Sequence, residues 1–228
     1  MKLLIINPNS DIAMTAVIRQ TAEDFAHGAF EVVCMPTPRA SGFIDSYQDE
    51  AEAAAGMMAL VDEHADQFDG VLVACMDDPN LDAIKEVTAK PVVGIAEAAM
   101  KIASMIGHRF SIVSTSRASV ANHQVLARKY YMEALLASVR YPEGDAADLS
   151  EEERFFEAAR AAVDEDMAEV IVLGCAGLAD MAKRLETRLK VPVLDGVVCG
   201  LIILSGMVKS GISISKIGRY RPRQGPAD

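Results

Sequence analysis

The sequence predicts an α/β fold in which two similar halves each contain a parallel sheet. Short runs rich in β-branched residues alternate with longer alanine-rich segments of helical period, a pattern typical of βαβ units. A strand, a cysteine, a helix and a second strand that begins with proline and valine occur twice along the chain. This long-period similarity predicts that the two halves share one architecture.

Eight apolar runs bounded by turn residues predict the strands. In chain order they cover residues 2–7, 31–35, 70–75, 91–94, 109–114, 135–141, 169–174 and 192–194. We expect helices in the intervals between these strands. Ser150 with Glu153 three residues later forms a capping box, so a helix is predicted from there through Val163. Asp78-Pro79 pairs a favoured N-cap with proline at the first helical position, which predicts a helix directly after the strand that ends at Cys75.

The internal similarity centres on Cys75 and Cys175. Each cysteine follows an apolar strand, and the next strand begins 16 residues later at Pro91 in the first copy and 17 residues later at Pro192 in the second. In each copy an earlier strand runs into a polar loop. The chain therefore divides into an expected first half and second half.

We place the first half at residues 1–96 and the second at residues 97–205. The segment 206–228 is a candidate to pack back on the first half. No Gly/Ser linker or low-complexity tract separates these parts.

Composition excludes several classes of function. The chain has 22 basic and 33 acidic side chains, a net charge of −11, so nucleic acid and membrane surfaces are not expected partners. The longest apolar run, residues 197–207, contains two glycines and a serine and is shorter than the ~20 residues that span a bilayer. The amino terminus lacks the pattern of a secretory signal. We therefore expect a cytoplasmic protein whose four cysteines stay reduced.

Two of the cysteines are candidates for catalysis. In open parallel sheets, ligands bind outside the carboxyl ends of the strands, and Cys75 and Cys175 both fall there. If the halves face each other about a pseudo-twofold axis, the two sulfurs converge from opposite sides of one cleft. A helix N-terminus after each cysteine is expected to lower its pKa from about 8.5 toward neutrality, which permits one thiolate and one thiol at pH 7.

Cysteine can also serve as a core residue, in a disulfide or as a metal ligand. Free cysteine is often a small core residue, which is the interpretation for Cys34 and Cys199, whereas the repeat favours function for the other two. A disulfide is opposed by the expected compartment. No metal site is expected, since C-x-x-C pairs are absent and the histidines fall in helix or turn contexts away from the strand ends. These histidines are His27, His64, His108 and His123. Nucleotide-binding glycine motifs are also absent, so neither NAD nor ATP is indicated.

Polar loops after the strands suggest a small polar ligand. Asn9 and Ser10 either bind such a ligand or cap the next helix, and Ser114-Thr115 has the same two interpretations. The small residues around Cys175, from Gly174 to Gly177, could present backbone N–H groups to an oxyanion. Asp77 could orient an N–H group of a ligand, whereas Asp78 fits the helix cap better.

These motifs together resemble the hydantoin and allantoin racemases of the aspartate/glutamate racemase superfamily. The segments that carry the resemblance are residues 5–10 (IINPNS), 74–79 (ACMDDP), 91–95 (PVVGI), 109–113 (RFSIV) and 171–177 (IVLGCAG). The resemblance extends from residue 3 to about residue 200. The first cysteine of the family is usually followed by Phe, whereas this chain has Met76. Both cysteines are present, unlike in the arylmalonate decarboxylase branch, which resembles the family in fold but keeps only the second thiol.

The resemblance implies a cofactor-independent racemase with two flavodoxin-like halves, each contributing one catalytic cysteine. Carried over by motif, these cysteines are Cys75 and Cys175. The implied substrate-binding residues are Asn9, Ser10, Phe43, Met76, Asp77, Asp78, Ser114, Thr115, Ala176 and Gly177. The family also implies a small-molecule substrate and a homo-oligomer.

The expected reaction is racemisation of a 5-substituted hydantoin by two opposed thiols, one acting as base and the other as acid. Alternatives within the superfamily are an allantoin racemase, an aspartate or glutamate racemase and a maleate isomerase. From other classes, a non-catalytic binding protein and a thiol redox protein remain open. The redox protein ranks last, because no resolving cysteine lies at C-x-x-C spacing.

Overall fold

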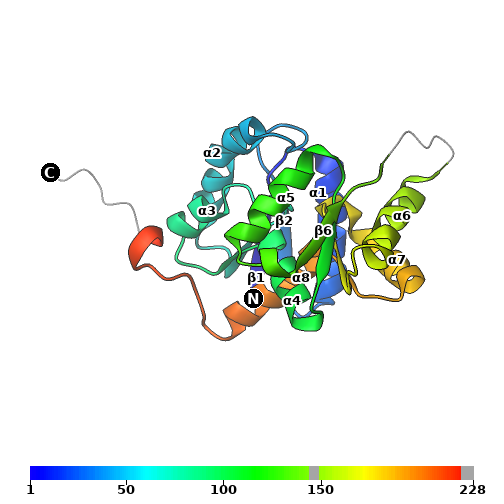
Figure 1. Cartoon of the computed structure of the whole chain (residues 1–228). Helices are drawn as coiled ribbons and strands as arrows, with labels where there is room; N and C mark the ends of the chain where they lie inside the picture. The colour runs from blue at the N-terminus through cyan, green and yellow to red at the C-terminus, as the bar shows by residue number, and fades with distance from the viewer. Residues whose placement is uncertain (144–148, 222–228) are drawn as a thin grey trace.

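The computed structural model describes residues 1–143 and 149–221 and contains two four-stranded parallel sheets (Figure 1). The first sheet has the order β2-β1-β3-β4 and the second the order β6-β5-β7-β8. The strands are β1 (Lys2–Asn7), β2 (Glu31–Pro36), β3 (Gly70–Val73), β4 (Val92–Gly94), β5 (Phe110–Val113), β6 (Leu136–Arg140), β7 (Val170–Leu173) and β8 (Val193–Leu194). Each predicted strand is present, and the identical order of the two sheets confirms the α/β fold of two similar halves.

Helices connect the strands in both halves. They are α1 (Ile12–Ala26), α2 (Tyr47–Glu63), α3 (Leu81–Val87), α4 (Ile95–Ile106), α5 (Ala118–Lys129), α6 (Glu151–Asp164), α7 (Ala182–Leu189) and α8 (Gly196–Lys209), with short 3-10 turns η1 (Glu133–Leu135), η2 (Ala176–Met181) and η3 (Gly218–Tyr220). In Figure 1, α2 and α3 lie at one side of the molecule and α6 and α7 at the other. The site described below therefore lies between two layered units.

The helix predicted from the capping box is α6. The Ser150 side chain accepts a hydrogen bond from the Glu153 N–H at 3.2 Å, as the motif requires. The Glu153 carboxylate, however, pairs with Arg188 of α7 at 2.9 Å. The serine half of the box therefore caps the helix, while its glutamate ties α6 to α7.

The prediction that Asp78-Pro79 starts a helix is wrong in its detail. Helix α3 begins at Leu81, and its N-cap is Asn80, which has a left-handed backbone (φ 57°) and makes no side-chain cap. Asp78 also has a positive φ, 44°, and its carboxylate binds α4 instead. Asp78 does cap a helix, as its residue type suggests, but the helix is α4 and not α3.

Helices α4 and α8 join the two sheets. Helix α4 follows the last strand of the first sheet and contacts β5 and β7 of the second, whereas α8 follows the last strand of the second sheet and contacts β3 and β4 of the first. Gly200 of α8 lets this helix approach β3, because a Cβ there would overlap the Leu72 side chain. The resulting core includes residues of both sheets, so the division at residue 96 remains a prediction.

The segment after α8 runs along α3. Lys216 Nζ donates to the Lys85 carbonyl at 2.7 Å, and the Tyr220 hydroxyl donates to Asp82 at 2.6 Å. The remainder of this segment, residues 222–228, lies outside the described residues. No helix in the described ranges has the length and apolarity needed to cross a membrane.

Candidate active site

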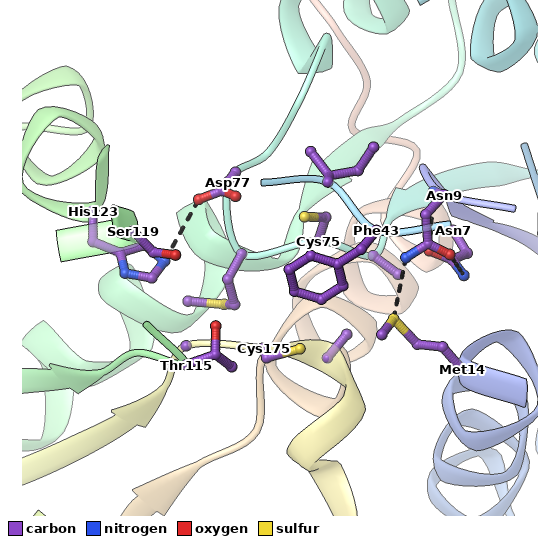
Figure 2. A pocket seen from close by; sticks show the side chains of 15 residues that line it. Asn7, Asn9, Met14, Phe43, Cys75, Asp77, Thr115, Ser119, His123 and Cys175 are labelled. Carbon is purple, nitrogen blue, oxygen red and sulfur yellow. Dashed lines mark hydrogen bonds and ion pairs between the residues drawn. The ribbon is translucent and has the colours of Figure 1, made fainter. Parts of the chain in front are cut away.

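Cys75 and Cys175 occupy matching positions beyond the central strands of the two sheets. Cys75 follows β3 by two residues and Cys175 follows β7 by two residues. The residue before each cysteine donates its N–H to the neighbouring strand: Ala74 to the Ile6 carbonyl at 2.9 Å, and Gly174 to the Val113 carbonyl at 2.8 Å. Both cysteines line one pocket of about 440 Å³, its mouth included (Figure 2).

Most of the residues proposed for substrate binding also line this pocket. The predicted residues found there, besides the cysteines, are Asn9, Phe43, Met76, Asp77, Thr115 and Ala176. Gly174, predicted as part of the oxyanion loop, also lines the pocket, and the lining residues that sequence reasoning did not select are Asn7, Met14, Ile44, Ala74, Ser119 and His123. Two of these follow from the fold: Asn7 and Ala74 adjoin predicted residues in the same loops.

Three of the predicted residues near the pocket have other roles. The Ser10 hydroxyl donates to the Ser41 carbonyl at 3.3 Å. Ser114 is fully buried, and its hydroxyl has no hydrogen-bond partner among the described protein atoms. The Gly177 N–H points to Cys175 Sγ at 3.4 Å, so this amide stabilises charge on the sulfur. None of the three is among the lining residues.

The loop after β1 places an amide side chain in the pocket without capping the helix. The N-cap of α1 is Asp11, whose side chain accepts from Ala13 and Met14 N–H groups, so neither Asn9 nor Ser10 fills that role. The Asn9 side-chain oxygen accepts from Asn7 Nδ2 at 2.7 Å, which orients its NH₂ group toward Met14 Sδ at 3.2 Å. Figure 2 shows this NH₂ group at the pocket wall. Asn9 is thus held as a hydrogen-bond donor.

Asp78 is a buried support of the Cys75 loop and does not line the pocket. Its carboxylate accepts from the N–H groups of Ala96 at 3.1 Å and Glu97 at 2.8 Å in the first turn of α4, and from the Tyr130 hydroxyl at 2.6 Å. A Cβ at Gly94 would overlap this carboxylate. Burial raises the pKa of Asp78 to about 6 against these three donors. Asp78 was predicted to bind the substrate, but in the structure it lies behind the pocket lining.

Both thiols resist ionisation in the unliganded site, contrary to the expected lowering. Burial is the main cause that raises the pKa of Cys75 well above its ordinary value, and the Asp77 carboxylate adds to it. Burial also raises the pKa of Cys175, against the Gly177 N–H, which lowers it. The helix dipole does not reach Cys75, because α3 begins only at Leu81, and Cys175 is followed by the short turn η2.

His123 is a pocket residue, so the expectation that all histidines lie away from the strand ends is wrong. It belongs to α5, four residues after Ser119, which lines the same wall. Its ring is buried and lies 3.7 Å from Asp77 Oδ1. The spacing of Ser119 and His123 on one helix face, directly after the Ser114-Thr115 loop, was the available signal.

The charge and ligand types at the site limit its chemistry. Asp77 is the single charged side chain among the described lining residues, and no lysine or arginine is among them. No group of three or more metal-binding side chains occurs in the part of the chain that the structure describes. The arrangement offers two sulfur groups in one pocket, amide and hydroxyl donors and one carboxylate. It can therefore move protons to and from a neutral ligand in the pocket.

The chain is similar to known proteins in both sequence and structure. The profile of the family described as Asp/Glu/Hydantoin racemase matches residues 3–202. A hydantoin racemase of a Pseudomonas species is 35% identical over 227 residues, covering 97% of this chain and 91% of that protein, and one of Paenarthrobacter aurescens is 35% identical over 228 residues, covering 97% of each. The structure of an allantoin racemase from Klebsiella pneumoniae superposes with a TM-score of 0.91 at 31% identity, covering 100% of this chain and 95% of that one.

Proposed function

The chain belongs to the Asp/Glu/Hydantoin racemase family, and from this premise we propose that it interconverts the enantiomers of 5-substituted hydantoins with Cys75 and Cys175 as opposed proton carriers. The observation that carries this proposal is the placement of both thiols in one pocket, each two residues beyond the central strand of equivalent sheets. A racemase must remove a proton from one face of a carbon and return one to the other. Two sulfurs from two halves meet that requirement without moving the substrate.

The reaction needs only proton transfers. The stereogenic C5 of a hydantoin lies between a ring carbonyl and a ring nitrogen. A thiolate removes the C5 proton and becomes a thiol, while the C–H electron pair moves onto the carbonyl oxygen as an enolate. The opposite thiol then protonates C5 and becomes the thiolate. The cysteine pair therefore changes roles with each turnover, and the reaction consumes no cofactor.

Donors near the thiols would stabilise the enolate. The Asn9 NH₂ group is held at the pocket wall by its bond to Asn7. A well-placed donor of this kind contributes on the order of 3 kcal/mol to the transition state. The Gly177 N–H, which points to Cys175 Sγ, stabilises the thiolate form of that cysteine.

The raised thiol pKa values suit a weak carbon acid. A base of higher pKa is a stronger proton acceptor once ionised, although a smaller fraction is ionised at neutral pH. The water-poor pocket then strengthens each remaining electrostatic contact. Because few thiols are ionised at neutral pH, their reactivity should depend on pH.

A neutral ring fits the site better than a carboxylate substrate. Aspartate, glutamate and maleate carry carboxylates that call for lysine or arginine partners, which the described lining lacks, and Asp77 would repel them. Allantoin is itself a hydantoin with a ureido group at C5. The likeness to the allantoin racemase structure makes allantoin the second candidate substrate.

The test is chiral chromatography of single enantiomers incubated with the purified protein. The panel contains 5-isopropylhydantoin, 5-benzylhydantoin, allantoin, aspartate and glutamate, each with an enzyme-free blank, and maleate, which has no enantiomers, is assayed for conversion to fumarate. We expect at least one hydantoin to racemise above its blank, with solvent deuterium entering C5 in D₂O, and the carboxylates to stay unchanged. Turnover of a carboxylate alone, or binding of hydantoins with no deuterium uptake, would contradict the proposal.

A further inference from the structure

Asp77 and His123 form a buried polar pair on one wall of the pocket. Their side chains are 15% and 1% exposed, and His123 Nε2 lies 3.7 Å from Asp77 Oδ1. The same Asp77 oxygen accepts from Asn122 Nδ2 at 2.7 Å, which fixes the carboxylate. The pair therefore faces the pocket in one defined arrangement, as Figure 2 shows.

The His123 ring has unused hydrogen-bonding capacity. Neither ring nitrogen has a hydrogen-bond partner among the described protein atoms, although buried polar atoms nearly always have one. Burial lowers the pKa of His123, and the Asp77 carboxylate opposes that effect. A neutral imidazole carries one N–H donor and one acceptor lone pair. The ring is thus able to donate to a neutral ligand.

The ring is also held firmly in place. A Cβ at Gly174 would lie 2.7 Å from Ser114 Cα and 3.2 Å from His123 Cε1, so the imidazole packs directly against the loop that carries Cys175. The absence of a side chain at Gly174 makes room for it. His123 therefore lines the pocket beside the Cys175 loop, where a group of a bound ligand would contact it.

The pocket has two different sides around the thiols. In Figure 2, Asp77, Ser119, His123 and Thr115 are drawn on one side of Cys75 and Cys175, Asn9 and Met14 on the other, and the Phe43 ring between the two sulfurs. A hydantoin that loses its C5 proton develops negative charge on the ring carbonyl. The Asp77 carboxylate would repel that charge, whereas the Asn9 NH₂ group would attract it. The ring carbonyl is therefore expected on the Asn9 side and the C5 substituent on the Asp77 side.

We propose that Asp77 and His123 are the specificity-determining pair for the C5 substituent, and that they select a neutral group with an N–H next to a carbonyl, such as a ureido or carboxamide group. This inference rests on the proposed function. The carboxylate accepts the N–H, and the imidazole donates to the carbonyl. An alkyl substituent would leave the His123 ring unpaired and Asp77 with Asn122 alone, and an unpaired buried polar group is a strong basis for rejecting a ligand.

The test compares two substrates in the same variants. We measure kcat/KM for allantoin and for 5-isopropylhydantoin in the wild type, in His123→Phe and in His123→Gln. The alkyl substrate serves as internal control for folding and for the thiols. Val125→Ala, on the exposed side of the same helix and outside the pocket lining, is the matched control and should leave the ratio of the two kcat/KM values unchanged.

The expected result is a selective loss. His123→Phe should lower kcat/KM for allantoin on the order of 10- to 100-fold relative to 5-isopropylhydantoin, and His123→Gln, which keeps an N–H, should restore part of the preference. Equal losses on both substrates, or none, would overturn the pair's role while leaving the racemase proposal intact. A wild type that prefers 5-aminoalkyl hydantoins would overturn the neutral-group assignment. A wild type that racemises no hydantoin contradicts the proposed function itself.

Discussion

The loops after Cys75 and Cys175 share two backbone hydrogen bonds at matching positions but differ in charge. In each, the N–H three residues after the cysteine donates to the cysteine carbonyl, from Asp78 at 3.0 Å and from Leu178 at 3.2 Å. The N–H two residues after each cysteine lowers the thiol pKa. The side chain at that second position differs: it is the Asp77 carboxylate in the first loop and Gly177 in the second. The two thiols therefore have different electrostatic surroundings before the substrate binds.

The two helices that join the halves differ in how their N-termini are capped. Helix α8 is capped locally by Asp195, whose carboxylate accepts from the Val198 N–H at 2.8 Å. Helix α4 starts at Gly94, which has no side chain to cap it, and Asp78 caps it from 18 residues away. Because Asp78 belongs to the Cys75 loop, the remote cap ties the first thiol to the second half. The local cap of α8 has no such consequence for Cys175.

The largest effect is expected from filling the space that the remote cap needs. In Gly94→Ala the new Cβ would overlap the Asp78 carboxylate, which would lose its bonds to α4 and Tyr130, at about 2 to 4 kcal/mol in the free energy of unfolding. Gly206→Ala in α8 is the matched control: its Cβ meets nothing within 4 Å, and alanine is favoured in helices by up to about 1 kcal/mol. Urea denaturation measures both. Equal stabilities would mean that the cap on α4 does not depend on Gly94.

A smaller effect, on thiol reactivity, sharpens the comparison of the two loops. Because burial raises both thiol pKa values, alkylation by iodoacetamide should become faster at each site from pH 7 to pH 9, as the thiolate fraction grows toward the pKa. Cys175 should react before Cys75, since the Asp77 charge opposes the Cys75 thiolate more strongly. Asp77→Asn should lower the pKa of Cys75 and speed its alkylation roughly tenfold, and that of Cys175 less.

Peptide mass spectrometry after timed quenching gives the two rates separately. Cys34 and Cys199 are buried in the core, and burial raises the pKa of each to about 12, so they should stay unmodified and report on folding. A rate at Cys75 that is flat from pH 7 to pH 9, or unchanged in Asp77→Asn, would show that the carboxylate does not control this thiol.

The sequence predicted the features that depend on neighbours along the chain. The strands follow from apolar runs between turn residues, and the Ser150 cap of α6 follows from residues three positions apart. The two thiols were predictable because each follows an interior parallel strand at its carboxyl end, where ligands bind in such sheets. Phe43 also lies in the pocket, as the family resemblance implied, although it remains 42% exposed.

The features that sequence reasoning missed depend on packing between distant segments. Asp78 looked like a local cap, but its partners are Ala96, Glu97 and Tyr130. His123 enters the pocket from α5 together with Ser119 one turn earlier, a spacing that sequence reasoning did not use. The thiol pKa values were predicted in the wrong direction, because burial outweighs the helix N-termini that the pattern suggested.

The most direct test of the account is exchange of the C5 hydrogen in D₂O by Cys75→Ala and Cys175→Ala, each given a single enantiomer of a hydantoin that the wild type racemises. We expect both variants to lose racemisation by roughly 100- to 10,000-fold. Each should still exchange deuterium into one enantiomer with retention, and the two variants should act on opposite enantiomers. Near wild-type racemisation by either variant, or exchange of the same enantiomer by both, would contradict two thiols on opposite faces of the substrate.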